Sequence, residues 1–152
     1  MNRVFILRHA KAGPHVANDH DRPLTDVGRH QAHSLGLWLT EQGIEFDAVL
    51  CSSSLRTVET VEHLGLSLGY RIVPQLYSAS ARVIESVIQA CPVEAGTLLI
   101  VAHNPGVSDL VDAAGLHDVM GTSAIVELMS EADFPSFVAS ECVVGRSYRP
   151  ES

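Results

Sequence analysis

The sequence has very little positive charge: Lys11 is its only lysine, and charged residues make up 18% of its 152 positions. Its formal net charge is −8. Nucleic acids and anionic membranes both require a basic surface, so we expect neither as a partner. The chain also lacks an apolar run near the roughly 20 residues that span a bilayer. Because 46% of its residues are hydrophobic, we expect a globular chain with one domain over residues 1–152.

Cysteine is scarce and shows no recognisable pattern. Cys51, Cys91 and Cys142 are odd in number, widely spaced and outside any CxxC arrangement. This pattern is typical of buried thiols in a reducing compartment. The N-terminus begins directly with a strand-like run and lacks the basic and apolar regions of a signal peptide. We therefore expect a cytoplasmic protein.

Short β-branched and aromatic runs alternate with amphipathic helical patterns along the chain. Strands are predicted at residues 4–7, 48–51, 71–73, 97–102, 123–129 and 137–144. Predicted helices begin at Thr25, Ser52-Ser53, Ser80 and Asn104-Pro105, where capping residues precede apolar stripes. The last two strands have no helix between them, which indicates an antiparallel edge. The fold class predicted is therefore a three-layer α/β/α sandwich with a mostly parallel central sheet.

Polar residues follow three of these strands directly. Arg8 and His9 end the first, Ser52 follows the second, and His103 follows the strand at 97–102. Ligands bind at the carboxyl ends of strands in open α/β sheets. Arg56 lies about one turn into the next helix, from where its guanidinium can reach the same edge. Helix N-termini and arginines together suit an anion, so the sequence predicts a phosphate-handling site.

Each of these residues also has an ordinary structural interpretation. A histidine at a strand end is often only a hydrogen-bonded structural residue, and Arg56 has Glu59 and Glu62 as possible partners on its helix. His30 and His33 have helical spacing but no nearby acidic residue, so a polar helix face is favoured over a metal site. The collection of several such residues at one sheet edge favours the phosphate site.

Several motifs then resemble one family. Leu7-Arg8-His9-Ala10 is similar to the RHG/RHA motif of the histidine phosphatase, or phosphoglycerate-mutase-like, superfamily. The segments 52–57 with Thr60 and 101–104 resemble its SSxxRxxxT and second-histidine motifs. Arg22-Pro23-Leu24-Thr25 with Gly28, and residues 122–125, resemble elements of its small SixA branch of phosphohistidine phosphatases. The resemblance covers nearly the whole chain and implies a single domain without a cap insertion.

The resemblance implies a role for each matching residue. His9 is expected to be the nucleophile, which attacks phosphorus and carries the phosphoryl group as a phosphohistidine intermediate. His103 is expected to donate a hydrogen bond to the transferring group, and the expected substrate-binding residues are Arg8, Arg22, Ser52 and Arg56. The arginines and histidines stabilise charge in place of a metal, so no metal or other cofactor is expected.

One departure from the family pattern concerns the general acid. Larger members supply a Glu or Asp from the loop after the third strand, but residues 74–80 contain no carboxylate here. An imidazole that leaves a ring-protonated P–N bond departs neutral and needs little help from an acid. The expected function is therefore phosphohistidine phosphatase. Asp19 or Asp21, within the loop Lys11 to Pro23, is an alternative source of a proton.

Two other functions stay open at this stage. One is a small-molecule phosphomonoesterase of the same superfamily, and the other is a non-catalytic module that binds phosphorylated proteins. The expected partner is accordingly a phosphohistidine-bearing protein or a small phosphorylated substrate. The acidic surface fits a monomer, whereas an exposed sheet edge would allow pairing with another copy, so the sequence leaves the oligomeric state open.

Overall fold

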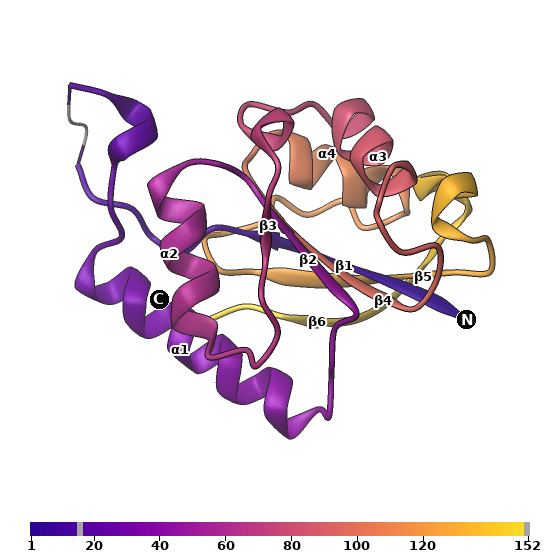
Figure 1. Ribbon diagram of the computed structural model, residues 1–152, viewed down its shortest axis with the longest axis horizontal. Helices are drawn as coiled ribbons and strands as arrows, with labels where there is room; N and C mark the ends of the chain where they lie inside the picture. The colour runs from indigo at the N-terminus through magenta and orange to yellow at the C-terminus, as the bar shows by residue number, and fades with distance from the viewer. Residues whose placement is uncertain (15–16, 151–152) are drawn as a thin grey trace.

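The computed structural model describes residues 1–14 and 17–150, and in these ranges six strands form one mixed sheet (Figure 1). The strands are β1 (Asn2–Arg8), β2 (Ala48–Cys51), β3 (Arg71–Ile72), β4 (Thr97–Ala102), β5 (Ile125–Ser130) and β6 (Val143–Tyr148). Their order is β3-β2-β4-β1-β5-β6. The first four in this order are parallel, and β5 and β6 are antiparallel to their neighbours. The predicted mostly parallel sheet with an antiparallel edge is confirmed.

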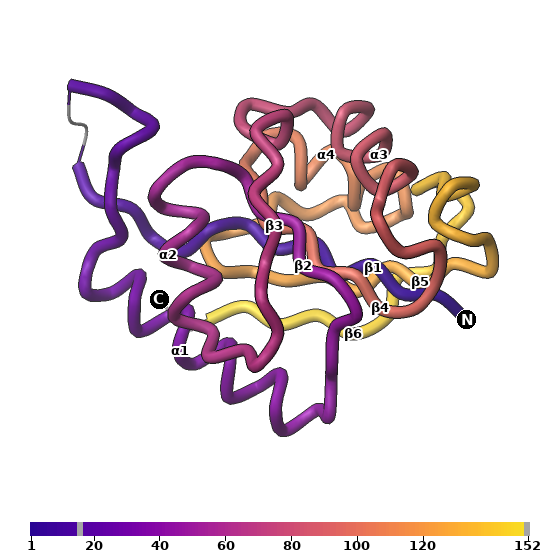
Figure 2. Tube along the Cα trace, viewed as in Figure 1, coloured from indigo at the N-terminus to yellow at the C-terminus, as the bar shows by residue number. Residues whose placement is uncertain are grey.

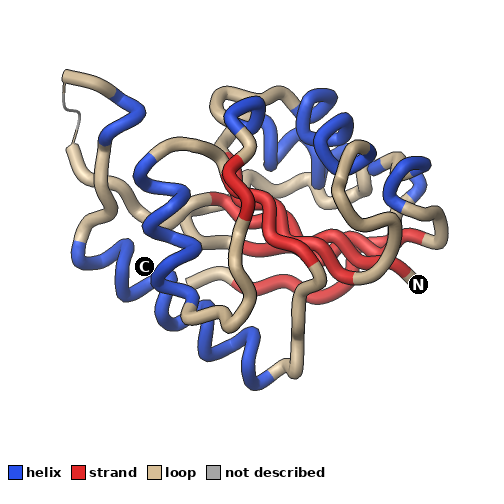
Figure 3. The backbone as a smooth tube through the Cα atoms, in the orientation of Figure 1, coloured by secondary structure: helices blue, strands red, loops and turns tan. Residues whose placement is uncertain are grey.

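Helices cover both faces of the sheet, as Figure 3 shows. One side carries α1 (Asp26–Glu41) and α2 (Leu55–Leu64), and the other carries α3 (Ala81–Gln89) and α4 (Gly106–Ala113). Short 3₁₀ turns η1 (Asp19–Asp21), η2 (Pro74–Leu76), η3 (Phe134–Ser136) and η4 (Ala139–Glu141) lie in the connections. The three-layer α/β/α architecture follows from this arrangement.

The central strands are buried on both faces, which explains their continuous apolar runs. In β1, Phe5 and Leu7 pack among residues of α1 and α2, while Val4 and Ile6 pack among residues of α3 and α4. All four side chains have no exposed surface. The sheet therefore separates two hydrophobic cores and holds β1 and β4 rigidly side by side.

Two helix starts differ from the predicted ones. The cap of α2 is Ser54, whose hydroxyl accepts from the backbone N–H of Thr57, and not Ser52 or Ser53. Ser52 instead continues the sheet, because its N–H donates to the carbonyl of Val101. The cap position of α4 is Pro105 and not Asn104, whose side-chain amide donates to the carbonyl of Met120. In both cases the residue predicted as the cap from local preference makes a tertiary hydrogen bond instead.

The second antiparallel strand was predicted at residues 137–144, and the structure places β6 later, at Val143–Tyr148. Phe134 and Phe137 are fully buried and belong to the core on the α3 and α4 side. They anchor the turns η3 and η4 there. The apolar pattern in this segment therefore comes from buried turn residues, which a strand prediction cannot separate from a strand.

The segment between β1 and α1 extends beyond the carboxyl end of β1 (Figure 2). It was predicted as a loop over Lys11 to Pro23; within it, residues 15–16 lie outside the described residues, and Asp19–Asp21 form η1. Ala12 and Leu24 form an antiparallel bridge at its base. None of the helices in the described ranges has both the length and the apolar character to cross a membrane.

Candidate active site

The carboxyl ends of β1, β2 and β4 place the predicted site residues at the same edge of the sheet. Leu7 and Cys51 are both paired with Val101 in the sheet, so the residues that follow them stand side by side. His9 donates its backbone N–H to the carbonyl of Ala102 over 3.2 Å. The rings of His9 and His103 then lie 5.2 Å apart between centroids. The structure therefore brings the two histidines together at the strand ends, and their shared role in catalysis stays a prediction.

His9 is held in a form that suits a nucleophile. Its Nδ1 lies 2.7 Å from the carbonyl oxygen of Ala10, so Nδ1–H donates there and Nε2 carries the lone pair. The pKa of His9 is lowered to about 4, mainly by burial and also by the charges of Arg56, Arg8 and Arg22, against the opposing hydrogen bond to Ala10. His9 is therefore neutral at pH 7, with Nε2 ready to form a bond.

His103 is neutral for similar reasons. Burial lowers its pKa to about 3, and the neighbouring His9 and Arg56 act in the same direction. Its Nε2 lies 2.8 Å from the hydroxyl of Ser52, which is itself fully buried. When Ser52 donates to Nε2, the proton of the neutral ring resides on Nδ1 and can be donated to a ligand.

The site contains buried donors without partners. Arg8 Nε, Arg56 Nε and His103 Nδ1 have no hydrogen-bond partner among residues 1–14 and 17–150, although each atom is buried. Folded proteins leave few buried polar atoms unpaired, and those that remain call for an explanation such as a ligand. The two arginine Nε–H groups, together with His103 Nδ1 when it carries the ring proton, suit a phosphoryl group, which offers several acceptor oxygens.

Asp19 connects the extended loop to this site. Its carboxylate accepts hydrogen bonds from the Tyr77 hydroxyl at 2.6 Å, from Arg22 at 3.0 Å and from Arg56 at 3.1 Å. The hydrogen bonds from Tyr77 and Arg22, followed by those from Arg56, hold the pKa of Asp19 well below its usual range. An ionised Asp19 has no proton to give, which argues against its suggested role as general acid in this arrangement.

The other predicted residues reach the site in different ways. Arg22 donates to Asp19 and, through Nε and its other terminal nitrogen, to the carbonyl of Gly13, so its guanidinium braces the loop. The side chain of Asp21 is 68% exposed, and its Oδ1 lies 3.9 Å from Nδ1 of His20. Ser52 contacts His103, through which we expect it to act. Direct contacts of Arg22 and Ser52 with substrate stay predictions.

Three residues that position the site through hydrogen bonds, Thr60, Ser123 and Tyr77, were not assigned roles from sequence. Thr60 accepts from the N–H of Ala10 at 2.9 Å and donates to the carbonyl of Arg56, and its position in the SSxxRxxxT pattern could have indicated this. Ser123 has a left-handed backbone, with φ of 61°, and donates its N–H to the carbonyls of both Arg8 and His9. No sequence signal marked Ser123 for this backbone role or Tyr77 for its contact with Asp19.

The motif Arg22-Pro23-Leu24-Thr25 with Gly28 has a structural explanation at the base of the loop. The Thr25 hydroxyl accepts from the N–H of Gly28 at 3.0 Å and donates to the carbonyl of Lys11 at 3.2 Å. A Cβ on Gly28 would collide with that same carbonyl. Glycine is therefore required for α1 to approach the chain that follows His9.

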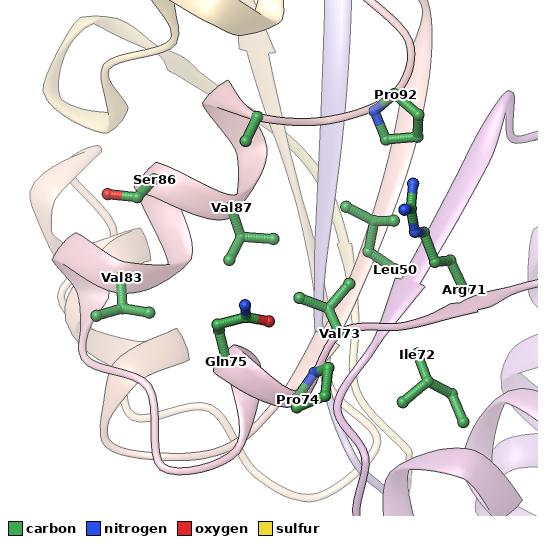
Figure 4. A pocket seen from close by; sticks show the side chains of 11 residues that line it. Leu50, Arg71, Ile72, Val73, Pro74, Gln75, Val83, Ser86, Val87 and Pro92 are labelled. Carbon is green, nitrogen blue, oxygen red and sulfur yellow. The ribbon is translucent and has the colours of Figure 1, made fainter.

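A hollow of about 460 Å³ lies elsewhere, between α3 and the edge strand β3 (Figure 4). Its walls are largely apolar, with Leu50, Val73 and Val87 pointing inward and Arg71 at one side. None of the site histidines or arginines lines it. Over the described ranges, no group of three or more His, Cys, Asp or Glu side chains is arranged to hold a metal ion.

The fold and the site together define a class: α/β proteins with two buried histidines beside arginines at the carboxyl ends of parallel strands. Comparisons with known proteins identify the family. Residues 4–77 match the model of the histidine phosphatase superfamily (branch 1). An uncharacterized protein of Mycobacterium tuberculosis is 36% identical over 131 residues, which cover 86% of this chain and 82% of that protein.

Two further comparisons specify the branch. The phosphohistidine phosphatase SixA of Escherichia coli is 32% identical over 115 residues, covering 72% of this chain and 71% of SixA. The structure of the protein histidine phosphatase SixA complexed with tungstate matches with a TM-score of 0.81 and 27% identity, over 95% of both chains. The chain therefore belongs to the histidine phosphatase superfamily and to its SixA-type branch.

The protonation states lead to a direct prediction. The imidazole signals of His9 and His103 in ¹⁵N NMR spectra are expected to stay those of neutral rings from pH 7.5 down to about 5, because burial lowers both pKa values well below the reference of about 6.5. The His9 ring is expected to carry its proton on Nδ1. Signals that disappear in His9→Ala and His103→Ala assign the two rings.

Stability has a matching pH dependence. Between pH 6.5 and about 4 the unfolded chain binds protons at these histidines and the folded chain does not, so stability is full above pH 6.5 and falls as the pH drops. Titration of either ring near pH 6.5 in the folded protein would contradict both the protonation states and this pH window.

Proposed function

We propose that this protein is a phosphohistidine phosphatase that works through a phosphorylated His9. The observation that carries the proposal is the set of unpartnered buried donors, Arg8 Nε, Arg56 Nε and His103 Nδ1, beside the neutral His9 ring. These groups supply a nucleophile and the positive charge that a transferring phosphoryl group requires. The SixA relatives support the same substrate class.

The reaction has two steps in this proposal. Nε2 of His9 forms a bond to phosphorus, and the P–N bond of the substrate breaks with its electron pair going to the leaving imidazole nitrogen. Water then attacks phosphorus of phospho-His9, the P–Nε2 bond breaks, and its electrons return to Nε2. The water proton leaves with phosphate or to solvent. Arg8, Arg56 and His103 stabilise the phosphoryl oxygens in both steps.

The terminal nitrogens of Arg56 already donate to Asp19, at 2.8 Å to its carbonyl and 3.1 Å to its carboxylate. The unpartnered Nε is therefore the nitrogen through which Arg56 binds the phosphoryl group while the loop keeps its place. Lysine offers a single point charge and cannot contact Asp19 and a phosphoryl oxygen with separate, fixed nitrogens. This division of donors accounts for arginine at position 56.

The leaving group is the second reason for favouring phosphohistidine. Residues 74–80 contain no carboxylate, and Asp19 is held ionised by Tyr77, Arg22 and Arg56. An alkoxide would leave without a proton donor here, whereas a ring-protonated phosphoimidazole releases neutral imidazole. Sugar phosphates and other phosphomonoesters are accordingly expected to be poor substrates. A phosphoprotein is the favoured partner, since we infer a single domain without a cap over the site.

The test is an acid-free, denaturing quench of the enzyme mixed with ³²P-labelled phosphohistidine protein. We expect transient label on the wild type, lost on later acid treatment, together with release of phosphate in the presence of a chelator. His9→Ala is expected to show neither. Binding without label or release would favour the non-catalytic module, and rapid turnover of sugar phosphates with none of phosphohistidine would favour the phosphomonoesterase.

A further inference from the structure

Four aromatic side chains form a row that leads from the buried site to the surface. The ring centroids of His9 and His103 are 5.2 Å apart, those of His103 and Tyr77 5.6 Å, and those of Tyr77 and His20 4.9 Å. The two catalytic candidates His9 and His103 are 7% and 6% exposed. Tyr77 is half-buried, and the side chain of His20 is 38% exposed. The row therefore runs outward.

Tyr77 and His20 are fixed in this row by contacts from several elements. Tyr77 packs edge-on against both neighbouring rings, and the guanidinium of Arg56 lies 6.0 Å from its ring centroid. Its hydroxyl donates to Asp19. His20 Nε2 lies 2.9 Å from the hydroxyl of Ser53. These contacts hold a rigid aromatic wall beside the arginine that binds the phosphoryl group.

We propose that Tyr77, with His20 behind it, forms the subsite that takes the imidazole ring of the phosphohistidine leaving group. This inference rests on the proposed function. A phosphoryl group held at His9, Arg8 and Arg56 directs its substituent away from the buried end of the row, along Tyr77. A planar heteroaromatic ring packs well against such a wall, and aromatic pairs contribute beyond their buried area. Tyr77 is thus a specificity-determining residue.

The aromatic wall is expected to distinguish between two substrates that both contain a P–N bond, phosphoramidate and N-phosphoimidazole. Phosphoramidate carries only an amine on phosphorus, whereas N-phosphoimidazole carries the ring. We expect Tyr77→Ala to lower the selectivity for N-phosphoimidazole over phosphoramidate, measured as the ratio of kcat/KM values, by roughly 2- to 10-fold. Tyr77→Phe keeps the ring and removes only the hydrogen bond to Asp19, so it is expected to keep the selectivity of the wild type.

The two variants distinguish ring recognition from loop anchoring. Equal losses for both substrates in Tyr77→Ala, or a loss of selectivity in Tyr77→Phe, would show that Tyr77 acts through Asp19 and would overturn the subsite. Unchanged kcat/KM values for both substrates in Tyr77→Ala would overturn it as well. Wild-type hydrolysis of both compounds with either of these results would leave the proposed function standing. A wild type that hydrolyses neither these compounds nor phosphohistidine protein would overturn the proposed function and this subsite with it.

Discussion

Replacing His9 with alanine is expected to abolish phosphate release, with a loss of at least about 10⁴-fold in kcat, while the protein stays folded. The reason is that the neutral Nε2 is the atom proposed to form the bond to phosphorus. His103 lies beside it, but its Nε2 is engaged by Ser52. Rapid-quench measurements of phosphate release from phosphohistidine protein give the loss directly.

The fold is expected to tolerate this change. The hydrogen bond of His9 is local, from Nδ1 to Ala10, and its backbone N–H keeps its bond to Ala102. We expect a change in unfolding free energy within about 1 kcal/mol, determined by urea titration. His33→Ala, which removes an exposed imidazole from α1, is the matched control and should keep wild-type turnover. Turnover that survives in His9→Ala would contradict the assignment of the nucleophile.

The α/β architecture could be predicted from the sequence because several strand and helix patterns indicated it independently. The runs at Val4–Leu7 and 97–102 are continuous and β-branched, so burial on both faces and the parallel sheet followed from them. The convergence of His9, Ser52 and His103 then followed from topology alone. Arg56 lies on the first turn of α2, close to the position predicted, even though the predicted cap was wrong.

What was missed depends on contacts that no local pattern encodes. The two terminal nitrogens of Arg56 donate to Asp19, whereas its Nε has no partner among the described residues. Asp19 is distant from Arg56 in the sequence. Tyr77 reaches the site because η2 turns the chain after β3, a strand of only two residues. The left-handed backbone of Ser123 occurs at a residue other than glycine, so composition did not predict it.

The second large effect is expected for Val101→Asp, which should unfold the protein or lower its unfolding free energy by about 4 kcal/mol or more. Val101 has no exposed surface and lies in β4, paired on one side with Leu7 and on the other with Cys51. A carboxylate at this position would be buried without a partner. Since whole domains are stable by only about 5–15 kcal/mol, the loss removes much of the total.

Two controls separate the buried charge from other effects of the substitution. Val119 is 78% exposed, so Val119→Asp adds the same charge in solvent and is expected to change stability by less than about 0.5 kcal/mol. Val101→Ala removes only volume and is expected to lower stability by about 2 kcal/mol. Urea unfolding followed by circular dichroism compares the three, and a stable Val101→Asp protein would contradict the packing of β4.

Val101 also connects stability to activity. Its carbonyl accepts the N–H of Ser52, whose hydroxyl contacts His103, and the chain reaches His103 two residues later. The same sheet therefore holds both histidines, and we expect them to keep their relative positions for as long as the sheet is intact. We expect Val101→Ala to keep turnover at temperatures where it is fully folded and to lose it on heating together with its β-sheet signal. Loss of turnover far below unfolding would instead mean that the strand ends move independently of the sheet that holds them.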